Sequence, residues 1–165
     1  MTLRRNNVTL AGHQTIMRTF PLIALIAIAM LPSEATLNAA AVSSPDVLLR
    51  KADSFALGGV GVAGTMSEGE RALREVLKQS DAVARLESIL PEASAPGQLY
   101  ALLGLRVRDR DAYQRALAKY GQRETSVQTA RGCILQQEAF RALVKEIDHG
   151  NYDSSLSRSW PESAR

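Results

Sequence analysis

The glycines of the segment Gly59-Val60-Gly61-Val62-Ala63-Gly64 match the GxGxxG pattern, whose spacing is known from phosphate binding. In dinucleotide-binding proteins this pattern follows a strand and opens a helix, so that backbone amides hold a pyrophosphate. Here the preceding residues Leu48 to Leu57 have helical spacing, and the next helix is expected only from Ser67. We therefore predict no nucleotide cofactor, and we interpret the glycines as a hinge between two helices. The glycines of this predicted hinge are Gly58, Gly59, Gly61 and Gly64.

Cys133 is the only cysteine, and it is therefore the only candidate for a nucleophilic thiol. A reactive thiolate needs a neighbouring base or cation, and His149 is the only histidine after residue 41. Three interpretations stay open: a small buried hydrophobic residue, a disulfide between two chains, or a functional thiol. One cysteine and one histidine are too few for an ordinary zinc site, so no metal site is predicted.

Alternating charges surround Asp109, in the run Arg106-Val107-Arg108-Asp109-Arg110-Asp111. Charges at a helix junction usually complement the ends of the helices, but the arginines could also contact an acidic partner. The acidic residues elsewhere fall at predicted caps and on polar faces, so no catalytic residue is predicted. The residues of the candidate interaction surface are Arg106, Arg108, Arg110, Tyr113 and Trp160.

Capping signals divide the chain after residue 42 into short helices. Ser44-Pro45-Asp46 is typical of a helix start, and Ser67 with Glu70 forms a capping box. Further starts are predicted at Ser80-Asp81, Pro96-Gly97 and Asp109. The clearest helix is expected from about Gln137 to His149, where apolar residues recur at helical spacing before Gly150.

Two segments do not fit this helical pattern. Residues 124–135 alternate with a period of two and contain β-branched residues, which predicts one short extended segment or strand. The tail from residue 151 to residue 165 is rich in serine and has no apolar stripe, which is typical of disorder.

The predicted fold is mostly all-α, a compact antiparallel array of about six short helices. Between Ser67 and Gly121 the helix–turn–helix periodicity faintly resembles the paired helices of HEAT or armadillo repeats. No residue motif accompanies this resemblance, so it implies an arrangement of helices and no function.

The N-terminal segment has the features of a secretory signal peptide. Phe20 to Leu31 is an uncharged apolar run of 12 residues, too short for a membrane-spanning helix of about 20 residues. Arg18 precedes the run, and cleavage is expected after Ala35 or Ala41. Met17 is an alternative start, because the region before it is long and polar for a signal peptide. Residues 1–41 are therefore expected to be removed, leaving one helical domain over residues 42–150.

The charge balance argues against a nucleic-acid partner. Of the 20 basic and 17 acidic residues, three basic and one acidic lie in the expected leader, which leaves a net charge of +1. Nucleic-acid binding rests on a concentrated positive surface, and this sequence predicts none.

These features predict a secreted or periplasmic helical protein without a cofactor, which is not an enzyme and binds another protein. Such a protein would not bind a membrane after its signal is removed. Accessory, inhibitory or immunity-like roles all fit this description. Two alternatives stay open: a small thiol-dependent enzyme or hydrolase centred on Cys133, or a carrier of a small apolar ligand between helices.

Overall fold

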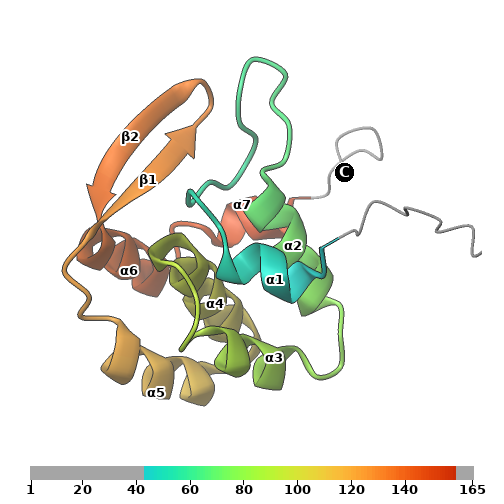
Figure 1. Ribbon diagram of the computed structural model, residues 1–165, viewed down its shortest axis with the longest axis vertical. Coiled ribbons are helices and arrows are strands. Elements are labelled where there is room, and N and C mark those ends of the chain that lie inside the picture. The colour runs from blue at the N-terminus through green and yellow to red at the C-terminus, as the bar shows by residue number, and fades with distance from the viewer. Residues whose placement is uncertain (1–42, 159–165) are drawn as a thin grey trace, which may run out of the picture. The chain divides into compact units, whose positions relative to one another are not determined.

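The computed structural model describes residues 43–158, which form seven helices and a two-stranded antiparallel sheet (Figure 1). The predicted signal peptide and Trp160 lie outside the described residues. The helices are α1 (Pro45–Arg50), α2 (Glu68–Leu77), α3 (Ala82–Ile89), α4 (Ala95–Arg108), α5 (Arg110–Tyr120), α6 (Phe140–His149) and α7 (Asp153–Ser157). The strands are β1 (Ser126–Arg131) and β2 (Ile134–Ala139). The prediction of a mostly helical protein is confirmed at this level.

Helix α4 is the centre of the core. Its residues from Pro96 to Leu105 are all buried, and it contacts α1, α2, α3, α5 and α6. A helix that is apolar on every side must be covered on every side, which explains why the other helices surround it. The Ser94 hydroxyl accepts a hydrogen bond from the Gly97 N–H at 3.1 Å and so fixes the start of α4.

Most of the predicted capping residues stand at helix ends, although α4 is capped by Ser94, ahead of the predicted Pro96-Gly97, and Ser44 and Asp81 make no side-chain capping bond. The Ser67 hydroxyl accepts from the Glu70 N–H, and Asp109 accepts from two amides in the first turn of α5. Gly150 ends α6 in the left-handed conformation, with φ of 83°. These caps involve residues close in sequence, and local sequence patterns therefore locate them well.

Two predicted helix boundaries are wrong. α1 ends at Arg50 and does not continue to Leu57, because Phe55 is extended and its N–H donates to Gln128 O of β1 at 2.8 Å. The last long helix begins at Phe140 and not at Gln137, because residues 137–139 belong to β2. In both places pairing with β1 replaces helical hydrogen bonds.

The segment predicted to be extended forms a hairpin of two strands, not one strand. β1 and β2 pair with Arg131 opposite Ile134 and with Ser126 opposite Ala139, so Gly132 and Cys133 make the turn. Gly132 has φ of 59°, a conformation that glycine adopts without strain.

Helix α7 lies in the tail for which composition predicts disorder, and the structure differs from the prediction there. Arg74 of α2 donates to the carbonyl oxygens of Ser155, Leu156 and Arg158 at 2.7–3.2 Å. The ring of Tyr152 meets Phe55 edge-on, with 5.2 Å between the ring centroids. Contacts with residues about 80 to 100 positions earlier therefore hold this helix, and its own sequence does not reveal them.

Candidate functional site

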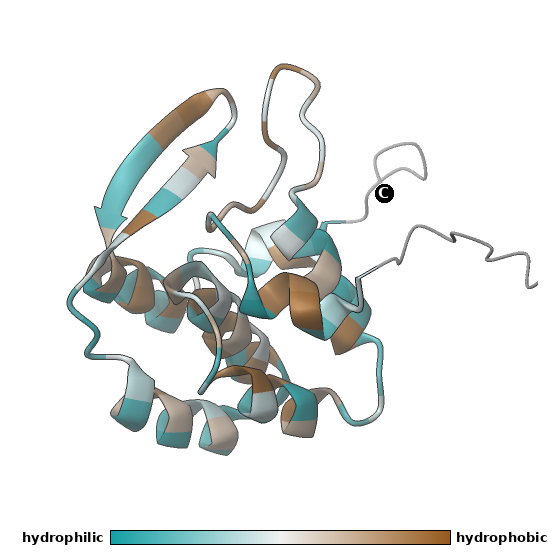
Figure 2. Ribbon diagram, viewed as in Figure 1, coloured by the Kyte–Doolittle hydropathy of each residue, from teal (hydrophilic) through white to brown (hydrophobic). Residues whose placement is uncertain are grey.

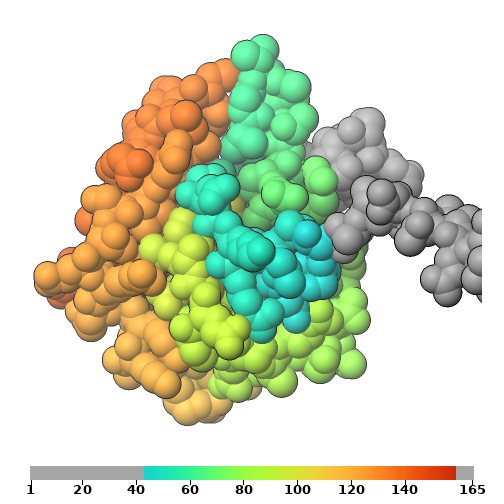
Figure 3. Space-filling view, viewed as in Figure 1, coloured from blue at the N-terminus to red at the C-terminus, as the bar shows by residue number. Residues whose placement is uncertain are grey.

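The glycine-rich segment, residues 55–66, projects from the helical body beside the hairpin (Figures 1 and 3). Gly61 N–H donates to Gly132 O at 2.9 Å, which ties the segment to the hairpin turn. Within the segment, Val60 and Thr65 pair in an antiparallel bridge. We call the hairpin and this segment together the hairpin end.

The predicted hinge glycines all lie in this segment and all have positive φ: 88° for Gly58, 99° for Gly59, 70° for Gly61 and 59° for Gly64. The segment connects α1 to α2. Its geometry also differs from a dinucleotide loop, because three residues separate Gly64 from the start of α2 at Glu68.

The base of the glycine-rich segment is held by buried polar groups. Ala56 and Tyr100 exchange two hydrogen bonds of 2.9 Å, in which the Tyr100 hydroxyl donates to Ala56 O and accepts from Ala56 N–H. The Ser67 hydroxyl also donates to Ala56 O, at 2.7 Å. Glu70 Oε2 accepts from Gly58 N–H at 2.9 Å. Burial raises the pKa of Tyr100 to about 12, so its hydroxyl keeps its proton at neutral pH.

Apolar side chains are concentrated at the tips of the hairpin end. Val62 is 98% exposed, Ile134 is 60% exposed and Leu135 is 65% exposed. Among the described residues only four large hydrophobic side chains are exposed, and the fourth is Val107 of α4. Figure 2 shows the hydrophobic colour at the turn of the hairpin and at the tip of the neighbouring segment. Exposed apolar residues that gather in one place indicate a contact surface.

Cys133 is exposed at the turn of the same hairpin, so the interpretation as a buried hydrophobic residue is wrong. His149 is the last residue of α6, and no hydrogen bond joins it to Cys133 among the described residues. The structure therefore does not place a base against the thiol.

The outer edge of β2 has no strand beside it within residues 43–158. Phe140 N–H donates to Thr125 O at 2.9 Å, one step beyond the register of the hairpin. Because hydrogen-bonded and non-hydrogen-bonded pairs alternate in an antiparallel ladder, Leu135, Gln137 and Ala139 direct their backbone groups away from β1. β2 contains no lysine and no proline, which commonly protect such an edge.

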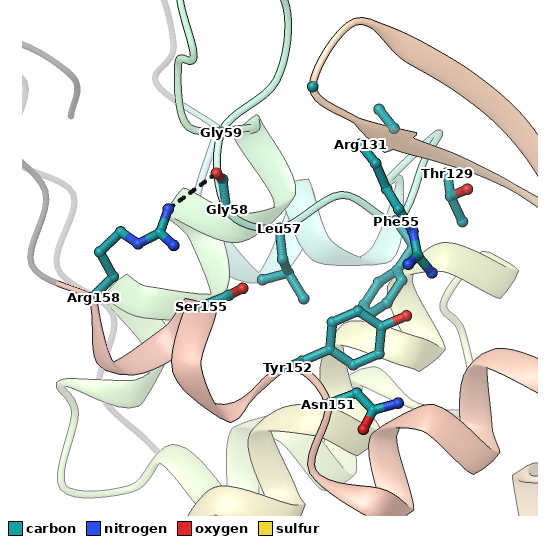
Figure 4. A pocket seen from close by; sticks show the side chains of 12 residues that line it. Phe55, Leu57, Gly58, Gly59, Thr129, Arg131, Asn151, Tyr152, Ser155 and Arg158 are labelled. Carbon is teal, nitrogen blue, oxygen red and sulfur yellow. Dashed lines mark hydrogen bonds between the residues drawn. The ribbon is translucent and has the colours of Figure 1, made fainter.

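A pocket of about 320 Å³ lies below the hairpin end (Figure 4). Its walls come from the start of the glycine-rich segment, from β1 and the hairpin turn, and from residues 151–158, which include α7. Phe55, Leu57 and the ring of Tyr152 form its apolar surface, and the charged residues in its lining are Arg131 and Arg158.

Arg131 is held by two carboxylates that lie outside the pocket lining. Its Nη2 is 3.1 Å from Glu146 Oε2 and 3.5 Å from Glu138 Oε2. The Tyr152 hydroxyl donates to Glu146 Oε2 at 2.7 Å. Partial burial lowers the pKa of Arg131, but the nearby carboxylates outweigh it, so the net shift is upward. The pKa of Tyr152 is raised mainly by burial and also by its bond to Glu146.

Two arginines of the predicted interaction surface, Arg106 and Arg110, line one surface hollow, whose lining does not include Arg108. Arg106 points into the molecule, where it pairs with Asp153 of α7, and its side chain is 13% exposed. Arg108 is exposed, and Arg110 lies near Asp148 and over the ring of Tyr113. Tyr113 itself is buried, which raises its pKa to about 12. Sequence reasoning missed the hairpin end, although the uncharged stretch Ile134-Leu135-Gln136-Gln137 was a signal for it.

No cluster of three or more metal-binding side chains occurs in the part of the chain that the structure describes. In that same part no helix combines the length and the apolar character needed to cross a membrane. Comparison with protein-family models, curated proteins and solved structures found no match.

Proposed function

We propose that this is an exported, non-enzymatic helical protein that binds an extended segment of another protein at its hairpin end. The observation that carries the proposal is the coincidence of two features at one place. Three of the four large exposed hydrophobic side chains in residues 43–158 lie at the hairpin end, and two of them, Ile134 and Leu135, belong to the open edge strand β2. A strand added to an open edge gains backbone hydrogen bonds, and apolar contacts beside the edge give it specificity.

The distribution of side chains along β2 favours a different protein over a second copy of this chain. In a fully overlapping antiparallel pairing of two β2 strands about a two-fold axis, the outward-facing residues pair with one another. Leu135 of one copy would then lie opposite Ala139 of the other, and Gln137 would lie opposite Gln137. The two apolar tips would then sit at opposite ends of the new sheet and would leave each other exposed. A partner strand with apolar residues at one end covers Ile134 and Leu135, which lie at the turn end of β2.

Export of the protein is supported by the short apolar run and the small residues after it. The faint likeness to HEAT or armadillo repeats remains a proposal about helix arrangement and adds nothing to the binding argument.

The experiment places a photo-reactive amino acid at position 135 and, as a control, at position 107, in the full chain expressed in its native cells. A partner crosslinked from position 135 is then purified, and its affinity is measured for the wild type, Leu135→Glu and Val107→Glu. We expect Leu135→Glu to weaken binding at least about tenfold, since a charge would be buried in the apolar contact, while Val107→Glu binds normally.

Three outcomes would overturn the proposal. They are crosslinking from position 107 but not from position 135, unchanged affinity of Leu135→Glu, and crosslinking only to a second copy of this chain.

A further inference from the structure

The pocket below the hairpin end has the features of a small anion site. The two charged residues of its lining are arginines that come from separate elements, Arg131 from β1 and Arg158 from the residue after α7. No acidic residue takes part in the lining. Figure 4 shows the two side chains on opposite sides of Leu57 and Ser155.

The hydrogen bonding of the arginines leaves donors available. Both carboxylates near Arg131 contact its Nη2, so its Nε and Nη1 donate to no atom of the described residues. Arg158 donates one long bond of 3.4 Å to Gly58 O. Within residues 43–158 no carboxylate lies within ion-pair distance of Arg158.

Neutral side-chain donors and glycine backbone complete the lining. Asn151 and Ser155 contribute an amide and a hydroxyl, and Gly58 and Gly59 contribute backbone without side chains. A Cβ added to Gly58 would lie 3.3 Å from the Ser155 hydroxyl oxygen. Glycine at this position therefore keeps the approach between the segment and α7 open.

The charge and the shape of the pocket point to the class of ligand. Two carboxylates, Glu138 and Glu146, already bind Arg131, so the positive charge available to a ligand comes from Arg158 alone and suits a single negative charge. Phe55 and Leu57 supply an apolar surface beside it, and about 320 Å³ is room for a small ligand. We infer that the pocket binds a carboxylate attached to a small apolar group, either a free organic acid or the C-terminal residue of a peptide. This inference does not depend on the proposed binding of a partner at the hairpin end.

The test is a titration of the full chain with two small probes. Binding is monitored by NMR as shifts in the amide signals of Gly59 and Ser155. The probes are N-acetyl-leucine and N-acetyl-leucine amide, which share the apolar body and differ in the carboxylate. We expect saturable shifts with the acid and none with the amide. A short peptide with a C-terminal leucine forms a third arm: tighter binding than the acid indicates a peptide terminus, and equal binding indicates a free acid.

Arg158→Gln is the variant that tests the role of the arginine. Because Arg158 is exposed, we expect the variant to fold. The variant loses a hydrogen bond to the charged carboxylate of the ligand, so we expect its affinity for N-acetyl-leucine to fall at least about tenfold. Arg141→Gln is the matched control, since Arg141 is also exposed and lies outside this pocket. The inference fails if the acid does not bind, if the amide binds equally, if Arg158→Gln binds like the wild type, or if inorganic phosphate binds more tightly than the acid.

Discussion

Glu70 is the residue on which the connection between the glycine-rich segment and the C-terminal helix depends. Its side chain is fully buried, accepts from Gly58 N–H, and pairs with Arg74 at 2.7 Å. Arg74 in turn binds the carbonyl groups at the end of α7. Replacement of Glu70 with alanine would leave the partly buried Arg74 without its carboxylate and the Gly58 N–H without its acceptor. We expect the free energy of unfolding in urea to fall by about 3–5 kcal/mol.

Two further variants separate this effect from the loss of any acidic residue. Glu70→Gln keeps a side-chain oxygen that can accept from the Gly58 N–H, so it should lose less stability than Glu70→Ala. Glu75→Ala removes an exposed pair with Lys78 and should cost about 0–1 kcal/mol. Equal losses for Glu70→Ala and Glu75→Ala would show that the buried pair has no special role.

Tyr100 makes the stability of the protein depend on pH in the alkaline range. Its pKa is about 12 in the folded protein because it is buried, against about 10 in an unfolded chain. Between these values the unfolded chain loses the proton and the folded protein keeps it. The contribution of Tyr100 is therefore present in full below about pH 10 and is lost as the pH rises toward 12.

Tyr100→Phe should reduce the loss of stability above pH 10. Part of that loss should remain in the variant, because Tyr113 and Tyr152 also have a raised pKa. At neutral pH the variant should be less stable by about 1 kcal/mol, because the hydrogen bonds with Ala56 are lost. Urea unfolding measured across this pH range checks both effects. An alkaline slope identical to that of the wild type would contradict the assignment to Tyr100.

Among single residues, the sequence reveals those that act locally. Ser67 and Asp109 cap helices through amides two or three residues away, and their types and spacing are sufficient to identify them. The bond between Tyr100 and Ala56 spans 44 residues, and the pairing of Arg131 with Glu146 depends on how α6 packs beside the hairpin. Such pairs follow from tertiary structure, and no spacing pattern marks them.

At the scale of elements, periodicity predicts the helices whose apolar faces meet the core, and it fails where a strand partner is needed. Gln136, Gln137 and Glu138 are compatible with a polar helix turn, and only their pairing with β1 makes them a strand. Phe55 likewise continues the helical spacing of α1, but its backbone bonds to β1. The open edge of β2 could not be predicted, because the second strand itself was not.

Helices α1 and α4 approach each other most closely at Gly97. A Cβ at this position would lie 2.1 Å from the backbone oxygen of Leu49, and backbone cannot move aside as a flexible side chain can. We expect Gly97→Ala to lower the free energy of unfolding by about 3 kcal/mol, the upper part of the range for overpacked cores. Chemical denaturation of the purified variant measures this loss.

Gly104→Ala is the matched control in the same helix. Its added methyl would meet the ends of the Leu86 and Leu73 side chains at 2.8–2.9 Å, and these can change rotamer. Alanine is favoured over glycine at both helical positions, by about 1 kcal/mol in a helix interior, so a larger loss for Gly97→Ala comes from the close approach to Leu49. A larger loss for Gly104→Ala than for Gly97→Ala would contradict this account of the packing.

Across the described part of the molecule, the buried core and the proposed binding surface belong to different regions. The buried residues of the helices surround α4, whereas the hairpin end carries exposed apolar tips and an open strand edge. Variants at the tips should therefore change affinity with little effect on unfolding. Variants of buried core residues should lower the free energy of unfolding with little effect on affinity.

The most direct test of the proposed binding mode is the affinity of Gln137→Pro for the crosslinked partner. The Gln137 N–H is directed away from β1, so proline at this position removes no bond of the hairpin but blocks an incoming strand. Gln137→Ala keeps the N–H and serves as the control. We predict at least about tenfold weaker binding by Gln137→Pro, normal binding by Gln137→Ala and unchanged unfolding in urea for both. A folded Gln137→Pro variant that binds the partner as tightly as the wild type would contradict strand addition at β2.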